Sequence, residues 1–194
     1  MTRILDIWLS GGWVMIPLFA VAVLIYAQAF QLVLYVRRTK ISQKGGAHWF
    51  QWVSAPESAD EGNVADIIRY TQADVRSAKQ IRNRFDEVRL GIVSLIDRRT
   101  KFVGTLVAAA PLLGLLGTVL GMLQTFFGIS TSGGAETAGV VASGISEALV
   151  TTQTGLTIAL PGLFLVMIIQ RQRHEIEASL ARLESLTLSH FKFD

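Results

Sequence analysis

Two long uncharged stretches decide the fold: residues 102–130 read FVGTLVAAAPLLGLLGTVLGMLQTFFGIS, and residues 137–170 read TAGVVASGISEALVTTQTGLTIALPGLFLVMIIQ. About 20 consecutive apolar residues suffice to cross the hydrocarbon core of a bilayer as a helix. Both stretches exceed that length, and they contain one ionisable side chain, Glu147. The short connection between them predicts an antiparallel pair of membrane-spanning helices at 102–130 and 138–170, joined by a loop at 131–137.

A third uncharged run, residues 13–36, lies near the N-terminus. It is too long for the apolar core of a cleaved signal peptide and is followed directly by Arg37, so we expect a retained span. Only 17% of the residues are charged, against about 25% in a typical soluble domain, and 51% are hydrophobic. This composition excludes intrinsic disorder, and the absence of cysteine excludes a disulfide scaffold and thiolate chemistry.

Basic residues are concentrated on one side of the three predicted spans. Residues 37–101 hold 13 Lys and Arg against 8 Asp and Glu, and residues 171–194 hold four of each. Residues 1–12 hold only Arg3, and the loop at 131–137 has no basic residue. Because cytoplasmic loops carry the excess of Lys and Arg, we expect 37–101 and 171–194 in the cytoplasm and the other two segments outside. The net charge of +3 therefore reflects membrane orientation, and we expect no nucleic-acid partner.

Both cytoplasmic segments are predicted to contain helices that continue the spans. Beyond Asn63, a candidate N-cap, we expect one or two amphipathic helices that run into the second span. The third span is expected to continue as a helix in the same way. These expectations depend on apolar residues that recur at helical spacing: Ile67, Ile68, Val75, Ile81, Phe85, Val88, Ile92, Ile176, Leu180 and Leu183.

Residues 44–62 form the least regular stretch of the sequence, with two glycines, a proline and scattered polar residues. Trp49, Phe50 and Trp52 lie within it. They are interpreted either as an aromatic anchor at the membrane interface or as a small hydrophobic plug. Packing at the membrane surface is favoured here over docking of a partner.

The second and third spans carry more small and polar residues than a simple membrane anchor needs. Gly117 and Gly121 form a G-x-x-x-G motif, which lets helix backbones approach closely. The third span has eight polar side chains in its first two thirds, so this helix must face protein or water. We assign helix packing to six residues of these spans: Gly114, Gly117, Gly121, Gly155, Pro111 and Pro161.

Glu147 is the most informative single residue. A carboxylate at the centre of a membrane costs about 2.5–3.5 kcal/mol on insertion scales, so such residues are retained where they line an ion path or pair with a partner. A proton-accepting site is the functional interpretation, and a structural carboxyl between helices or near the outer interface is the alternative. At about 100° per residue, Thr151 and Thr154 lie on the face of Glu147 and Thr152 lies on another. Two polar faces favour a ring-like oligomer, with a subunit interface and a lumen.

Two stretches of these spans resemble the signature helices of the ExbB/TolQ/MotA proton-channel family. They are APLLGLLGTVLGM at 110–122 with Phe126, and GISEALVTTQTGL at 144–156 with Ala159 and Pro161. The predicted topology also agrees, with three spans, an outside N-terminus and a large cytoplasmic loop. The ExbB branch looks nearest, given the short N-terminus and the motif Gly11-Gly12-Trp13 with Pro17, and TolQ is the near neighbour.

The resemblance implies a multi-pass protein of the bacterial inner membrane, with a periplasmic N-terminus and a cytoplasmic C-terminus. It implies a pentamer whose second and third spans line a pore, occupied by helices of an ExbD- or TolR-like single-span partner with an intramembrane Asp. Thr118 and Thr152 match the family threonines that line this pore, and Glu147 matches the family glutamate on the proton pathway. Thr151 and Thr154 are added from the helical geometry, as possible pore or packing residues.

We therefore expect an all-α proton-channel subunit that converts the proton motive force into work on a TonB-like protein, energising outer-membrane transport. One alternative is a TolQ-like subunit acting on a TolA-like protein in the Tol-Pal envelope system. Another is a passive assembly subunit whose polar groups serve only helix packing.

An enzyme is not expected, because no Asp or His lies within a predicted span. Three spans without internal repeats disfavour a secondary transporter, and a flagellar stator subunit usually has a fourth span. No catalytic residue, metal or cofactor is expected. Membrane lipids are also expected as partners.

Overall fold

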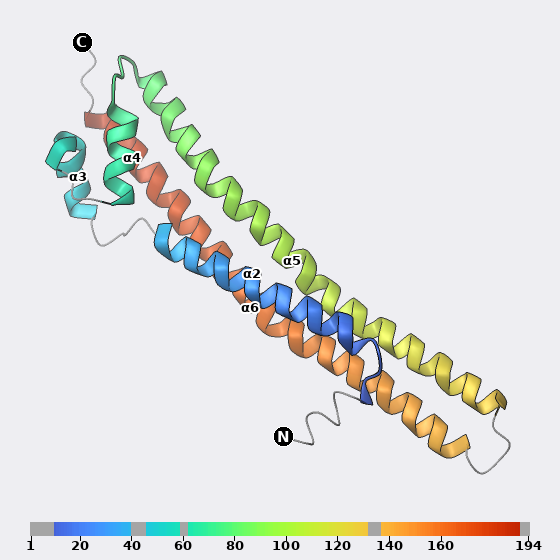
Figure 1. The fold of residues 1–194 in the computed structure, drawn as a ribbon. Coiled ribbons are helices and arrows are strands. Elements are labelled where there is room, and N and C mark those ends of the chain that lie inside the picture. The colour runs from blue at the N-terminus through green and yellow to red at the C-terminus, as the bar shows by residue number, and fades with distance from the viewer. Residues whose placement is uncertain (1–9, 40–45, 59–61, 132–136, 191–194) are drawn as a thin grey trace. The chain divides into compact units, whose positions relative to one another are not determined.

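The computed structural model describes residues 10–39, 46–58, 62–131 and 137–190. The regular elements in these ranges are all helical (Figure 1): α2 (Met15–Thr39), α3 (Gly46–Ser54), a short 3-10 helix (Pro56–Ser58), α4 (Asn63–Gln72), α5 (Ala78–Thr131) and α6 (Thr137–His190). Among them α2, α5 and α6 are long and apolar enough to cross a membrane. The predicted all-α fold with three membrane-spanning helices is thus confirmed. Most of the predicted outer loop, and the first nine residues of the N-terminal segment, lie outside the described residues.

The chain divides into two compact units, to which the three long helices all contribute. One unit comprises Met1–Phe30 and Lys101–Met167, and it contains most of the uncharged sequence. The other comprises Gln31–Thr100 and Ile168–Asp194, and it contains most of the charged residues. We refer to them as the apolar unit and the charged unit.

The apolar unit is built from α2, α5 and α6, which pack side by side through two buried clusters. One cluster joins the middle of α2 to α5 and α6: Ile25, Ala29, Val103, Val107, Ala110 and Ala159. The other holds the start of α2, where Val14, Met15 and Leu18 are almost completely buried. Leu113 and Leu120 of α5 and Val150 and Ile158 of α6 pack against it. The first turn of α2 is therefore fixed against both of the other long helices.

The core of the charged unit is formed by the apolar stripes that were predicted from the sequence. Ile67, Ile68, Val75, Ile81, Phe85, Ile176, Leu180 and Leu183 are all buried, and Val88 and Ile92 pack against them. Full burial of such a side chain is worth about 1.5–3 kcal/mol, so burial of these residues stabilises this unit. The expectation of one or two helices beyond Asn63 that run into the second span is confirmed, because α4 and α5 follow Gly62 and α5 continues into that span.

Residues 44–62 are more regular than predicted, because Gly46–Ser54 forms α3 and Pro56–Ser58 forms the 3-10 helix. Trp49 is 1% exposed and lies in the core of the charged unit, where Trp52 packs against the same cluster. A membrane-surface anchor is therefore wrong for Trp49, and the alternative of a hydrophobic plug fits it. The apolar face of α3 repeats at i, i+3 and i+4, which stabilises a helix even where two adjacent glycines precede it.

The start of α4 also differs from the prediction. Gly62 occupies the N-cap position of α4, with no side-chain capping bond, and Asn63 is the first helical residue. The Asn63 side chain instead donates a hydrogen bond of 2.9 Å to the carbonyl oxygen of Arg38. The last carbonyls of a helix have no partner within the helix, so Asn63 satisfies one of them at the end of α2. Asn63 thus serves the preceding helix rather than its own.

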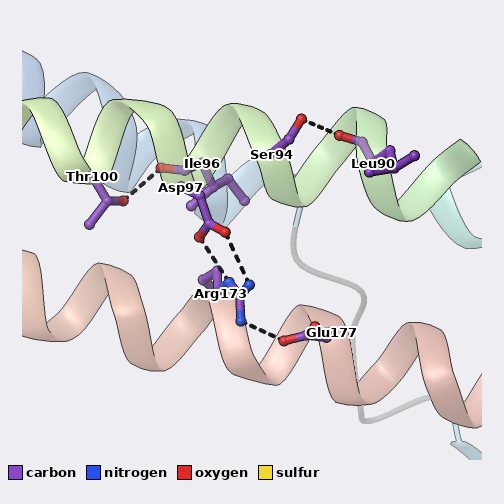
Figure 2. A network of polar contacts seen from close by, with 7 residues as sticks. All are labelled: Leu90, Ser94, Ile96, Asp97, Thr100, Arg173 and Glu177. Atoms are coloured by element: carbon purple, nitrogen blue, oxygen red, sulfur yellow. Dashed lines mark hydrogen bonds and ion pairs between the residues drawn. The ribbon is translucent and has the colours of Figure 1, made fainter. Parts of the chain in front are cut away.

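A network of charged side chains links α5 and α6 within the charged unit (Figure 2). Arg173 of α6 donates two hydrogen bonds to the carboxylate of Asp97 on α5, at 2.9 and 3.1 Å, and a third to Glu177 at 2.5 Å. The hydrogen bond to Asp97 raises the pKa of Arg173 above its ordinary value. A two-bond contact between guanidinium and carboxylate fixes the relative register of the two helices, because both partners are planar.

Replacement of Arg173 with leucine is expected to lower the stability of the charged unit by about 1 kcal/mol, because the network is partly exposed to solvent. The midpoint of thermal unfolding in detergent should fall by about 2–4 °C. Arg171→Leu is the matched control on the same helix, because the Arg171 side chain is 83% exposed and lies 3.5 Å from Glu175. Equal shifts for the two variants would contradict a specific role for the Arg173 network.

Candidate functional site

The second and third apolar stretches meet along a seam of glycines between α5 and α6. A Cβ atom added to Gly155 would lie 2.7 Å from the carbonyl oxygen of Ala110 and 3.3 Å from the Cα of Gly114. One added to Gly121 would lie 2.8 Å from the carbonyl oxygen of Gly144. The two backbones therefore touch, which only glycine permits at these positions. Gly114, Gly121 and Gly155, all assigned to helix packing from the sequence, lie on this seam.

Thr151 is fully buried in the same seam. Its hydroxyl donates to the carbonyl oxygens of Ala148 at 2.9 Å and Glu147 at 3.2 Å, both on its own helix. Its side chain occupies the space that a Cβ atom on Gly117 would need. Within this one chain, Thr151 therefore has the environment of a residue that packs the two helices together.

Thr152 and Thr118, the two predicted pore threonines, lie at the same level of the seam. The Thr152 hydroxyl crosses from α6 to α5 and donates to the carbonyl oxygen of Gly114 at 3.2 Å. In an α-helix, the carbonyl of residue i accepts from the backbone N–H of residue i+4, which is here Thr118. The Thr118 hydroxyl donates to the carbonyl oxygen of Leu115 at 2.6 Å, and both threonines are partly buried. Thr152 thus contacts α5 at Gly114, one helical turn before Thr118.

Glu147 lies on a different side of α6, facing the start of α2. A Cβ atom added to Gly12 would lie 2.6 Å from the Cδ of Glu147 and would overlap its carboxylate. Glu147 is partly buried, and Gly12 has a φ of +66°, a backbone conformation that favours glycine. Gly12 was assigned no role from the sequence, although it stands in the Gly11-Gly12-Trp13 motif. The two adjacent glycines of that motif were the sequence signal from which a role for Gly12 could have been predicted.

The remaining predicted residues lie at separate positions in the two helices. Thr154 is partly buried and donates to the carbonyl oxygen of Val150 at 2.7 Å. Pro111 is partly buried, Pro161 is exposed, and the helices α5 and α6 continue through them. Neither proline side chain is fully enclosed in this chain, and the assignment of both to helix packing stays a prediction.

Three of the eight polar side chains counted in the third span, none of them predicted as a site residue, lie exposed on α6. Ser146, Gln153 and Thr157 are all exposed, and their spacing places them along one side of the helix. A hollow of about 290 Å³ lies nearby between the helices, lined by Gln124, Thr125, Gly139, Val140, Ser143 and Gly144. Polar side chains at membrane depth face protein or a water-filled cavity. This side of α6, which we call the outer polar stripe, is therefore unsuited to contact with lipid.

Residues 60–182, more than half of the chain, match the sequence model of the MotA/TolQ/ExbB proton channel family. The chain belongs to this family. It is 34% identical over 173 residues to the putative biopolymer transport protein ExbB-like 1 of Synechocystis, a match that covers 81% of this chain and 67% of that protein. Biopolymer transport protein ExbB of Salmonella typhimurium is 38% identical over 85 residues, covering 44% of this chain. Tol-Pal system protein TolQ of Haemophilus influenzae is 38% identical over 69 residues, covering 36% of this chain.

These matches confirm the family expected from the two signature stretches. The chain spans 67% of the Synechocystis protein but only 34% of the Salmonella protein and 30% of the Haemophilus protein. Family membership and the three apolar helices make the chain a multi-pass membrane protein of a proton-channel family. Among the described residues, no three His, Cys, Asp or Glu side chains gather where they could hold a metal ion.

Proposed function

We propose that this protein is an inner-membrane subunit that, with an ExbD-like partner, converts the proton motive force into mechanical work on a TonB-like protein. The observation that carries this proposal is the position of Glu147, the only Asp, Glu, Lys, Arg or His in the three uncharged runs. The Glu147 side chain is partly buried, and it stands among the polar residues of the uncharged stretch of α6. The chain also belongs to a family of proton channels. We assign the proton pathway to Glu147, Thr118 and Thr152.

The mechanism combines one protonatable group on this chain with another on the partner. A proton from the outer side binds the carboxylate of Glu147, and waters and threonine hydroxyls carry it on to an intramembrane Asp of the partner. Each proton that crosses releases about 2.3 kcal/mol per 100 mV of membrane potential. A few protons per cycle thus suffice to move a pair of partner helices within a ring. Glu147 and Thr152 lie on different sides of α6, and Thr118 lies on α5, so the proposed pathway uses two faces of α6 and one of α5.

A ring of several copies, which we propose to be a pentamer, is supported by the surface of the apolar unit. In the most apolar window of each long helix, only 22–28% of the residues are buried inside this chain. Lipid can cover the apolar remainder, but it cannot solvate the outer polar stripe of α6. Neighbouring copies or a water-filled lumen would cover Ser146, Gln153 and Thr157. In the proposed orientation, the basic segments lie in the cytoplasm and the N-terminus in the periplasm.

The partner is identified by purifying the tagged chain from its native host in mild detergent and by mass spectrometry of the proteins that co-purify. We expect a single-span protein with an intramembrane Asp. A TonB-like companion would assign the complex to outer-membrane transport, whereas a TolA-like companion would assign it to envelope maintenance, the second candidate. That candidate is supported by the TolQ protein among the relatives. Recovery of this chain alone would favour the passive assembly subunit and contradict the proposal.

A further inference from the structure

The start of α2 forms a close-fitting seat for the carboxylate of Glu147. Gly12 brings bare backbone to the place where any other residue would put a Cβ atom into that carboxylate. The Gly12 carbonyl accepts from the N–H of Met15 at 3.3 Å, and the Trp13 carbonyl accepts from that of Ile16 at 3.2 Å, so the chain turns at Gly12 and Trp13 directly before α2 begins at Met15. The first N–H groups of a helix and its dipole both favour a nearby negative charge.

Buried neighbours on both sides hold this seat in place. Val14 is 1% exposed and Met15 is 3% exposed, and both pack against side chains of α5 and α6. A Cβ atom on Gly11 would lie 3.1 Å from the side chain of Val150, which is one turn beyond Glu147 on α6. The first turn of α2 therefore cannot withdraw from Glu147 without opening a buried cluster.

We infer that Gly12 is a positioning residue, which holds the carboxylate of Glu147 against the first turn of α2. This inference rests on the proposed role of Glu147 in proton transfer. It gives the first span a function beyond anchoring, because a displacement of its first turn would change where the carboxylate lies. The seat belongs to a single chain, so it is present in every copy of an oligomer.

A side chain added at Gly12 would displace the carboxylate of Glu147 rather than the helices. An added methyl group on Gly12 meets the end of a flexible side chain rather than backbone, so Glu147 can turn away while the helices stay in place. An added methyl group on Gly11 would instead meet the side chains of Met15 and Val150. Gly11→Ala therefore disturbs the same turn without touching the carboxylate, and it is the matched control for Gly12→Ala.

The test measures how accessible the carboxyl group of Glu147 is to an apolar reagent, in native membranes. Dicyclohexylcarbodiimide, an apolar reagent that modifies carboxyl groups inside membranes, is applied to wild type, Gly12→Ala and Gly11→Ala, and labelling of Glu147 is followed by peptide mass mapping. We expect several-fold faster labelling in Gly12→Ala and no comparable change in Gly11→Ala. A rate in Gly12→Ala that stays the same or falls, or an equal rise in both variants, would overturn the inference.

Further variants separate positioning from folding and from function. Gly12→Asn also adds a Cβ atom but tolerates a positive φ, so it should label as fast as Gly12→Ala if strain in the turn is not the cause. Glu147→Asp withdraws the carboxylate by one methylene, so its energising activity should not fall further when Gly12→Ala is added. A full additional loss in the double variant would overturn the inference.

Full activity of Glu147→Gln would refute the proposed function instead. The labelling result would still decide whether Gly12 positions the carboxylate of Glu147.

Discussion

Replacement of Glu147 with glutamine is expected to abolish proton-driven activity while leaving the protein folded and assembled. Glutamine has the same shape and remains able to form hydrogen bonds, but it cannot take up a proton. If every proton passes through this carboxyl group, transport energised by the complex should fall at least about tenfold, which corresponds to about 1.4 kcal/mol or more in the rate-limiting step. Uptake of a receptor-dependent nutrient by intact cells, with the native copy deleted, measures this loss.

The control for this prediction is Glu175→Gln, which changes the same residue type on the same helix within the charged unit. Glu175 forms an ion pair with Arg171 at the protein surface, so its loss should leave uptake unchanged. Thermal unfolding of Glu147→Gln in detergent should stay close to that of wild type. Full uptake by Glu147→Gln would mean that its carboxyl group is structural, and the passive assembly subunit would then be the better description.

The long helices could be predicted from the sequence because their signals are local and strong. Uncharged runs long enough to span a bilayer locate three helices, and apolar residues at helical spacing extend two of them into the charged unit. The helix α3 was missed because its stability comes from tertiary packing: Trp49 is buried by residues distant in the sequence. Asn63 was misjudged for a related reason, since its side chain bonds to Arg38 at the end of another helix.

The features of the candidate site likewise fall into those that the sequence could predict and those that it could not. Glu147 is conspicuous in the sequence because a carboxylate in an apolar run is costly, and Thr118 and Thr152 follow from the family resemblance. The contact between Glu147 and Gly12 joins residues far apart in the chain and depends on a φ of +66°, which no spacing rule reveals. The exposure of Gln153 and Thr157 likewise depends on how α6 is rotated against α5. Local patterns thus identify the chemistry, whereas the three-dimensional fit determines where it acts.

Replacement of Gly155 with alanine should cause the largest loss of stability among small substitutions in the apolar unit. The new Cβ atom would lie 2.7 Å from the carbonyl oxygen of Ala110, a backbone atom that cannot move aside unless the helices separate. Overpacking of this kind costs about 1–3 kcal/mol. In a chain of this size each kcal/mol lowers the midpoint of thermal unfolding by about 2–4 °C, which is measurable in detergent.

Gly139→Ala is the matched control on the same helix, because a Cβ atom at Gly139 meets nothing within 4 Å. There alanine should be neutral or stabilising by about 0.5–1 kcal/mol, as expected for an open position within a helix. Equal shifts for the two variants would contradict a close seam between α5 and α6. Separation at Gly155 would also lengthen the hydrogen bond from Thr152 to Gly114, so Gly155→Ala should lower uptake as well as stability. If uptake falls while the midpoint stays unchanged, Gly155 serves the proton pathway rather than the packing of the helices.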